Sequence, residues 1–297
     1  MRIVVAGAKG LLGHEVAHVL RTSGHELIAA DLEEDLLHDI AALDITQPAM
    51  VRGFLEATRP AWLINCAAYT QVDDCEEHEE VAFQVNGKAP GFLAEACNET
   101  GATLLHVSTD YVFDGTKDSP YTEDDLPNPL NVYGRSKLAG EEAIRCVTDK
   151  FIIVRPQWMF GPYGANFVST ILNKAREQDK VEVVDDQWGS PTYSKDLAKA
   201  IKLLLECDAR GIFHVCNRGQ ATWFDLAKKA IALAELETEV IPVGTQRFPR
   251  PAKRPRNSLL STKKFRDTTG KLLPPWQISL QDYLKEYLQE FRQGRHG

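Results

Sequence analysis

A tyrosine and a lysine four residues apart, Tyr133 and Lys137, have the types and spacing best suited to catalysis. On a helix, residues at i and i+4 lie on one face, so both side chains would reach the same space. A phenol with a pKa of about 10 is a poor acid or base at neutral pH, and we predict that the neighbouring ammonium lowers this pKa. The tyrosine would then exchange a proton with a carbonyl oxygen. The alternative is a surface pair on a solvated helix.

A hydroxyl residue, Thr109, follows directly after a short apolar run at 103–107. A hydroxyl at the end of a strand can hydrogen-bond the substrate oxygen that receives the proton, as a small oxyanion-type contribution. The alternative is that the Ser-Thr pair at 108–109 caps a turn. We predict that Thr109, Tyr133 and Lys137 form the catalytic group.

Three glycines near the start of the chain, Gly7, Gly10 and Gly13, follow an apolar run and open a segment with helical spacing. Glycine lets the backbone approach a diphosphate closely, and a helix N-terminus supplies free N–H groups and a partial positive charge. Asp31 ends the second apolar run, and a carboxylate there can accept hydrogen bonds from both hydroxyls of an adenine ribose. Together they predict a dinucleotide site; the alternatives are a tight glycine turn and a turn residue at Asp31.

The elements that must position these residues alternate between short apolar runs and amphipathic stretches. The runs predicted as strands are 2–6, 26–30, 61–68, 103–107 and 151–154, and the predicted helices between them include 11–22, 79–100 and 133–146. Such alternation is typical of βαβ units with a parallel sheet covered on both faces. We therefore predict an α/β fold with a Rossmann-type, doubly wound parallel sheet, whose ligand crevice lies at the carboxyl ends of the strands.

The character of the chain changes after Pro156. We place a boundary there, with a dinucleotide-binding Rossmann domain at 1–156 and a smaller C-terminal substrate-binding lobe at 157–297. Helices are expected at 166–177, 196–205, 224–236 and 280–292, and strands at 181–184 and 212–216. Whether parts of 190–220 rejoin the first domain is left open.

Composition limits the partners. The 297 residues are 43% apolar, and 34 Lys and Arg against 42 Asp and Glu give a net charge of −8. This composition excludes a fibrous or disordered chain, and the overall field does not attract nucleic acid or an anionic membrane. No apolar run has the roughly 18 residues needed to cross a bilayer, and the N-terminus resembles no signal peptide. We expect neither a nucleic-acid nor a membrane partner.

The six cysteines are isolated from one another in the sequence, without C-x-x-C pairs or zinc-ligand spacing. Isolated cysteines inside apolar stretches are mostly small buried hydrophobes. We therefore expect a reducing, cytoplasmic compartment.

The glycine spacing resembles that of the extended short-chain dehydrogenase/reductase superfamily. Asp44 and Ile45 match its adenine contact, and the Asn-Cys-Ala-Ala run at 65–68 is similar to its N-[AG]-A-[AG] element. The resemblance implies NADPH or NADH as cofactor; Asp31 would repel a 2′-phosphate and Lys9 would offset this, so the choice stays open. The implied cofactor-binding residues are Gly7, Lys9, Gly10, Leu11, Leu12, Gly13, Asp31, Asp44, Ile45, Cys66, Ala67, Ala68, Tyr133 and Lys137.

Longer blocks resemble one family of that superfamily, the dTDP-4-dehydrorhamnose reductases. They are STDYVFDG at 108–115, PLNVYGRSKLAGE at 129–141, DQWGSPT at 186–192 and RPRNSLL at 254–260. The resemblance implies NAD(P)H-dependent reduction of the C4 keto group of a dTDP-4-keto-sugar, dTDP-4-dehydrorhamnose, to give dTDP-L-rhamnose. Superfamily members of the dehydratase type carry Thr-Asp-Glu where this chain has Tyr111 in third place, which argues against dehydration.

The resemblance also implies the substrate-binding residues Thr109, Asp110, Trp158 and Arg254. Residues 247–266 contain eight basic residues and no acid, so this segment either clamps the substrate diphosphate through arginine contacts or forms a solvated basic face. For Trp158 the alternative is packing between the lobes.

One departure concerns metal. Some members of the family form a metal-bridged dimer through acidic residues, and the chain has Glu15 but Lys195 at one matching position. An ammonium does not ligate a hard cation, so we expect no metal and leave open whether the chain is a monomer or a homodimer.

Two rival functions remain. One is another nucleotide-sugar reductase or 4-epimerase of the superfamily, which as an epimerase would hold NAD tightly without consuming it. The other is a non-catalytic regulatory subunit resembling the β subunit of methionine adenosyltransferase; the intact Tyr133, Lys137 and Thr109 weaken that interpretation.

Overall fold

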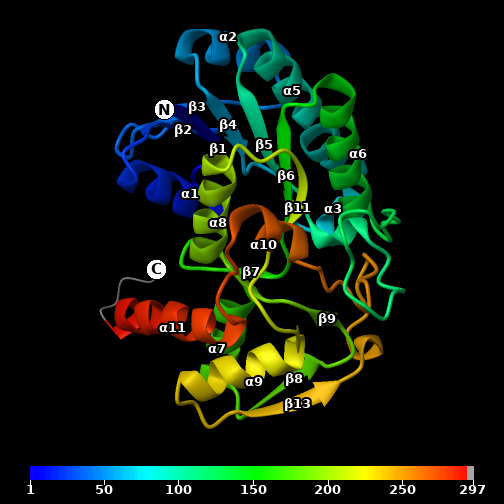
Figure 1. The fold of residues 1–297 in the computed structure, drawn as a ribbon. Helices are drawn as coiled ribbons and strands as arrows, with labels where there is room; N and C mark the ends of the chain where they lie inside the picture. The colour runs from blue at the N-terminus through cyan, green and yellow to red at the C-terminus, as the bar shows by residue number, and fades with distance from the viewer. Residues whose placement is uncertain (293–297) are drawn as a thin grey trace.

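The computed structural model describes residues 1–292, and its centre is a seven-stranded sheet in the order β11-β6-β5-β4-β1-β2-β3 (Figure 1). All neighbouring strands are parallel. The strands are β1 (Arg2–Ala6), β2 (Glu26–Asp31), β3 (Ile40–Ala42), β4 (Trp62–Asn65), β5 (Thr103–Val107), β6 (Phe151–Arg155) and β11 (Gly211–His214). The chain runs outward from β1 in both directions, which confirms the predicted α/β, doubly wound parallel sheet.

Helices cover both faces of this sheet. On one face α1 (Leu11–Thr22) and α8 (Ser194–Glu206) pack on side chains such as Ile3 and Val5; on the other, α2 (Pro48–Thr58), α5 (Ala89–Thr100) and α6 (Val132–Val147) pack on Val4 and its neighbours. Successive residues of a strand point to opposite faces, so β1 needs apolar residues throughout.

The segment at 194–214 lies on this sheet although it follows Pro156 in the chain. Strand β11 pairs with β6 at the sheet edge, and α8 lies beside α1. A segment inserted between two parts of the second lobe in sequence therefore helps to build the first. The division into a cofactor domain and a substrate lobe stays a prediction.

The second lobe lies below the sheet in Figure 1. Strands β8 (Lys180–Val184) and β13 (Glu239–Val243) pair in parallel, and α7 (Phe167–Glu177), α9 (Trp223–Leu233) and α11 (Trp276–Arg292) share an apolar core with them. Smaller elements complete the lobe and its connections: β7 (Met159–Phe160), β9 (Trp188–Gly189), β10 (Thr192–Tyr193), β12 (Ala221–Thr222), η3 (Thr245–Arg247) and α10 (Lys263–Thr269).

The helix predicted over 79–100 is interrupted. It divides into α4 (Glu79–Ala82), the π-helix η1 (Phe83–Lys88) and α5, and a short α3 (Asp74–Glu77) precedes it. Pro90 has no N–H for the carbonyl of Asn86, which leaves that turn free to widen. The carbonyl of Asn86 instead lies against Gly140 of α6, where a Cβ atom would collide with it.

Within residues 1–292, no helix combines the length and apolarity that a bilayer-crossing segment requires.

Candidate active site

A cavity of about 1240 Å³ lies at the carboxyl ends of the central strands. Its lining includes the glycine loop, the end of β2, the segment after β4 and the face of α6. The structure brings together here the following residues singled out by sequence: Gly7, Lys9, Gly10, Leu11, Leu12, Gly13, Asp31, Asp44, Ile45, Cys66, Ala67, Ala68, Tyr133, Lys137 and Arg254.

The glycine loop leaves no room for side chains. Gly7 has φ +79°, and a Cβ atom on it would lie 2.5 Å from the nitrogen of Ala67; a Cβ atom on Gly13 would collide with the carbonyl of Gly7. Helix α1 follows with Gly10 as its N-cap and no capping side chain. The first-turn N–H groups of α1 therefore stay available to an anion in the cavity.

Asp31 joins the glycine loop to β2. Its Oδ2 accepts a hydrogen bond from the backbone N–H of Lys9, and its Oδ1 accepts one from the N–H of Leu32, both at 2.8 Å. Asp44, further along the cavity wall, accepts hydrogen bonds from the N–H and hydroxyl of Thr46. These contacts fix the carboxylate of Asp31 at the place where a dinucleotide fold receives its adenine ribose.

Tyr133 lies in the first turn of α6, where Asn131 caps the helix by accepting a hydrogen bond from the N–H of Gly134 at 2.8 Å. Burial raises the pKa of the Tyr133 phenol above its ordinary value, and a hydrogen bond between the phenol and Thr109 acts in the opposite direction. The predicted net lowering of this pKa by Lys137 is wrong, because desolvation outweighs the other effects. The phenol is held protonated at neutral pH, as a proton donor must be.

Lys137 is buried with its ammonium end against β5. Its Nζ donates to the carbonyl of Val107 at 2.7 Å and lies 3.2 Å from Nε2 of His106. Burial lowers the pKa of Lys137 to about 8, although the nearby Glu141 and Cys66 act to raise it. This lysine thus titrates much closer to neutrality than an exposed one.

Thr109 and Asp110 lie behind the cavity wall rather than on it. Thr109 caps the short helix η2 (Asp110–Val112) by accepting from the N–H of Tyr111 at 3.2 Å, and its hydroxyl donates to Asp110 Oδ1 at 3.1 Å. Burial raises the pKa of Asp110 to about 7. The turn-capping alternative for Thr109 therefore holds, together with a hydrogen bond to Tyr133.

Trp158 does not line the cavity. It has φ +38° and stacks on Trp223, with ring centroids 3.7 Å apart, while its other contacts include the backbone of Gly189. Of this stacked pair, Trp223 is the one that lines the cavity. The structure thus favours the packing alternative for Trp158. Sequence reasoning missed Trp223, because its position before a predicted helix carries no signal of exposure to a ligand.

A second cavity of about 780 Å³ opens in the C-terminal lobe. Four residues line both cavities: Asp73, Phe167, Trp223 and Arg254. The guanidinium of Arg254 contacts the Asp73 carboxylate with both nitrogens, at 2.5 and 3.0 Å. Arg254 therefore lies where the two cavities meet, and the planar edge of its guanidinium is paired with the carboxylate of Asp73.

Much of the basic run at 247–266 is neutralised locally. Arg247 pairs with Glu182 at 2.7 Å, and Lys263 and Arg266 both pair with Asp267. Of the remaining cations, Arg250 and Lys253 line the second cavity with Arg254. The basic run therefore does not act as one unit. Some of its cations are paired with nearby acids, and others line the second cavity.

A buried ion pair anchors the catalytic helix, and sequence reasoning assigned it no role. Arg155 at the end of β6 binds both carboxylate oxygens of Glu141 at 2.9 and 2.5 Å, and the hydroxyl of Ser108 donates to the same carboxylate at 2.5 Å. Glu141 lies one turn after Lys137, so the ion pair joins α6 to β6, and the Ser108 contact joins α6 to the end of β5, where Thr109 follows.

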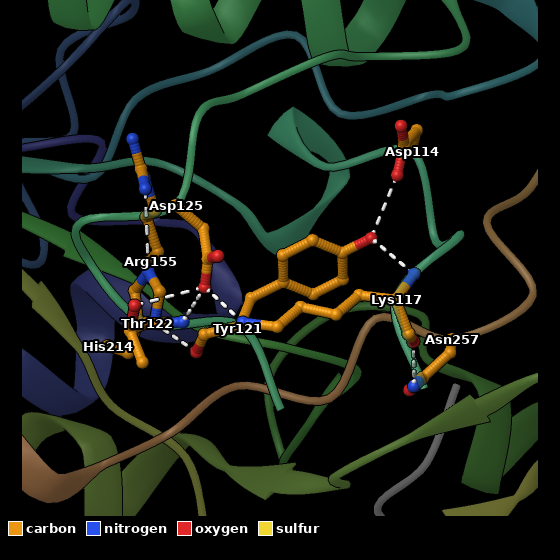
Figure 2. Close-up of polar contacts among 8 residues, drawn as sticks. All are labelled: Asp114, Lys117, Tyr121, Thr122, Asp125, Arg155, His214 and Asn257. Atoms are coloured by element: carbon orange, nitrogen blue, oxygen red, sulfur yellow. Dashed lines mark hydrogen bonds and ion pairs between the residues drawn. The ribbon is translucent and has the colours of Figure 1, made fainter. Parts of the chain in front are cut away.

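A second network ties the loop at 114–125 to the C-terminal half (Figure 2). The hydroxyl of Tyr121 donates to Asp114 at 2.8 Å, its carbonyl accepts from the Nδ1–H of His214 at 3.1 Å, and Asn257 donates to the carbonyl of Lys117 at 2.7 Å. This network positions the segment that follows Arg254.

Lys195, the position that departs from the metal-bridged dimer, forms an ion pair with Glu286 at 2.5 Å. Glu15 is buried nearby, and burial raises the pKa of its carboxyl. The ammonium of Lys195 therefore lies beside both acids.

Comparisons with known proteins point to one family. A family model described as the RmlD substrate binding domain matches residues 1–289. The dTDP-4-dehydrorhamnose reductase of Escherichia coli K12 is 37% identical over 299 residues, covering 96% of this chain and 98% of that protein. A dTDP-4-keto-6-deoxy-D-glucose reductase of Streptomyces niveus is 37% identical over 281 residues, covering 94% and 95%. A solved dTDP-4-dehydrorhamnose reductase from Bacillus anthracis, in complex with NADP, superposes with a TM-score of 0.90 at 35% identity, covering 96% and 99%.

Proposed function

The chain belongs to the dTDP-4-dehydrorhamnose reductase family, and from this premise we propose that it reduces the C4 keto group of dTDP-4-dehydro-L-rhamnose to give dTDP-L-rhamnose. The reductant is NADPH or NADH. The observation that carries the proposal is the single cavity in which a bare glycine loop lies at one side and Tyr133 and Lys137 at the other.

The residues of the first cavity fit a dinucleotide. The uncapped start of α1 would receive the diphosphate, Asp31 the adenine ribose, and Asp44 and Ile45 the adenine. Glycine is needed at positions 7 and 13 because a Cβ atom at either position would collide with backbone atoms of the glycine loop or of Ala67. When bound, the nicotinamide supplies the hydride, and the protein supplies position and the proton.

Tyr133 gives the proton to the substrate oxygen. Its burial keeps the phenol protonated until a carbonyl oxygen gains negative charge beside it. Thr109 orients that phenol through its hydroxyl, and Lys137 lines the same cavity one turn further along α6. The roles of the three residues thus follow from one buried constellation on α6 and after β5.

The second cavity would hold the nucleotide half of the substrate. It adjoins the first at Trp223 and Arg254, and it carries Arg250 and Lys253 near its rim. A sugar diphosphate spanning both cavities would place its diphosphate near Arg254 and its sugar near Tyr133.

The deciding experiment measures oxidation of NADPH and of NADH with dTDP-4-dehydrorhamnose and with dTDP-4-keto-6-deoxyglucose. We expect cofactor consumption with the first sugar and formation of dTDP-L-rhamnose. The 37% identity to a 4-keto-6-deoxyglucose reductase makes the second sugar the matched alternative. Epimerisation without net oxidation, or no turnover with either sugar, would contradict the proposal.

We also infer a reducing, cytoplasmic setting. All six cysteines are free thiols, and three of them are buried. Free thiols are typical of proteins in a reducing compartment, where disulfide bonds are rare. Sedimentation of the purified protein decides between the monomer and the homodimer.

A further inference from the structure

A row of buried polar groups runs behind the cavity wall from the segment after β4 to the catalytic helix. The N–H of Ala67 donates to Oδ1 of Asn65 at 3.1 Å. Nδ2 of Asn65 lies 3.0 Å from Nδ1 of His106, and Nε2 of His106 lies 3.2 Å from Nζ of Lys137. Asn65 and His106 have no exposed surface, and Lys137 has 1%.

The polarity of this row is set at its backbone end. A peptide N–H only donates, so the group that faces Ala67 must be the oxygen of the Asn65 amide. The NH₂ group of the amide then faces His106, and Nδ1 of the imidazole must accept. The reverse amide orientation would place two donors against each other in a buried site, which is costly.

The imidazole of His106 is neutral, because burial and the nearby Lys137 hold its pKa well below the ordinary value. A neutral imidazole carries one proton. With Nδ1 accepting from Asn65, that proton lies on Nε2 and faces Lys137 Nζ. An ammonium there would place two donors together, whereas an uncharged amine accepts the Nε2–H and still donates to the carbonyl of Val107 at 2.7 Å.

The charged and titratable groups around Lys137 come from several elements. Glu141 lies on its own helix, paired with Arg155, and Cys66 faces it from the segment after β4. Tyr133 lies one turn earlier on α6. Glu141 and Cys66 favour the ammonium, whereas burial favours the amine. Burial is the largest of these effects, so the pKa of Lys137 is lowered. The polarity of the row adds to the effect of burial.

We propose that Asn65 and His106 are positioning residues that present a fixed N–H to Lys137 and so favour its uncharged form. The inference rests on the proposed function for its consequence. A reduction consumes one proton per turnover. When Lys137 is protonated, a lowered pKa makes its ammonium a better proton donor to the Tyr133 phenolate: an N–H bond of the ammonium breaks and the O–H bond of Tyr133 forms. The amine that remains then takes a proton from water in the first cavity, which Lys137 and Tyr133 both line.

The test is a pH titration of the lysine side chains by NMR in protein labelled at the lysine ε-carbons, with Lys137 assigned through Lys137→Arg. In His106→Phe the ring and its burial remain but the N–H is lost. We expect the apparent pKa of Lys137 to rise by about one pH unit, since a donor that favoured the amine is gone. A fall would mean that Nε2 accepts from an ammonium, and the inference would be overturned. The surface lysines in the same spectrum are the internal control.

Asn65→Asp tests the same row without touching the imidazole. A carboxylate accepts from both Ala67 and Nδ1–H of His106, which turns a lone pair of Nε2 toward Lys137, so the pKa should again rise. Adding His106→Phe to Asn65→Asp keeps the charge but breaks the row. If the two changes raise the pKa of Lys137 additively, Asn65→Asp acts only as a distant charge. The proposed coupling of Asn65 to Lys137 through His106 would then be wrong.

The titration needs neither substrate nor cofactor. A chain without reductase activity but with these shifts would overturn the proposed function alone, whereas an active reductase with an unshifted Lys137 in both variants would overturn this inference alone. In an active enzyme the alkaline limb of the kcat profile should move with the pKa of Lys137.

Discussion

At the scale of single residues, turnover depends on the phenol of Tyr133. Tyr133→Phe removes the proton donor and little volume, so kcat should fall by at least about 10²-fold while the dissociation constant for NADPH stays nearly unchanged. Steady-state kinetics and cofactor titration by fluorescence measure the two effects. Turnover close to the parent rate in this variant would remove Tyr133 from the mechanism.

Arg254 should act on substrate binding. A charge-assisted contact is worth about 1.5–3 kcal/mol, so Arg254→Ala should raise the KM for the dTDP-sugar roughly 10–100-fold with a smaller change in kcat. Arg254→Lys should recover only part of this, because an ammonium cannot make a planar two-pronged contact. Substrate titrations at fixed low salt make the comparison, since screening weakens such contacts.

The structure supplies a control for Arg254 in its partner Asp73, which the guanidinium binds with both nitrogens. Asp73→Asn removes the competing anion and keeps the shape, so it should leave the KM unchanged or lower it. If Arg254→Ala and Asp73→Asn raise the KM equally, the ion pair orders the loop and the diphosphate is held elsewhere.

Residue types and spacing were enough to find the groups that chemistry requires at fixed offsets, such as Tyr133 with Lys137 and the glycines with Asp31. They were not enough for groups that meet only through tertiary structure. Trp158 and Trp223 are far apart in the chain and stacked in space, so which of them reaches the cavity depends on packing. The same holds for His106: near the end of β5, it has the sequence position of an ordinary buried strand residue.

At the scale of elements, the catalytic helix α6 is held by the Glu141–Arg155 pair, both partners being almost fully buried. Glu141→Gln leaves the guanidinium buried without a counter-charge, and the free energy of unfolding should fall by about 3–5 kcal/mol. Urea denaturation measures this loss. Replacing both partners by apolar residues, as in Glu141→Leu with Arg155→Met, should recover most of it, and a double variant as unstable as the single one would contradict the desolvation argument.

The alternation of strands and helices up to Pro156 predicted five of the six central strands in that part of the chain, because a buried parallel strand needs an apolar run that stands out. It missed the three-residue edge strand β3. It could not predict that β11 returns to the sheet edge after the first part of the second lobe, α7 and β8. The sequence of a four-residue strand does not indicate which strand it will pair with. The pairing of β11 with β6 is seen only in the folded structure. The π-helix at 83–88 was missed for a related reason: its cause is one proline and the approach of α6.

At the scale of the whole molecule, the two cavities meet where segments from both halves of the chain interlock. Gln157 hydrogen-bonds the carbonyl of Ser258, and Arg254 reaches Asp73. Asp110 is buried at this junction: Oδ1 of its carboxyl accepts from the hydroxyl of Thr109 at 3.1 Å, and Oδ2 has no partner among the residues that the structure describes. The ionisation of this one carboxyl therefore bears on the stability of the joined lobes.

Burial raises the pKa of Asp110 from 3.8 to about 7. The folded protein then binds this proton more tightly than the unfolded chain, so the stabilising contribution is complete below the unfolded pKa and is lost as the pH rises through about 7. Asp110→Asn removes the titration. Relative to the parent protein, its free energy of unfolding should therefore rise by roughly 2–3 kcal/mol between about pH 5 and about pH 8.5. Urea denaturation at both pH values measures the difference, and the exposed Asp118→Asn should show no such trend. A constant offset between Asp110→Asn and the parent at both pH values would mean that Asp110 ionises as freely in the folded protein as in the unfolded chain.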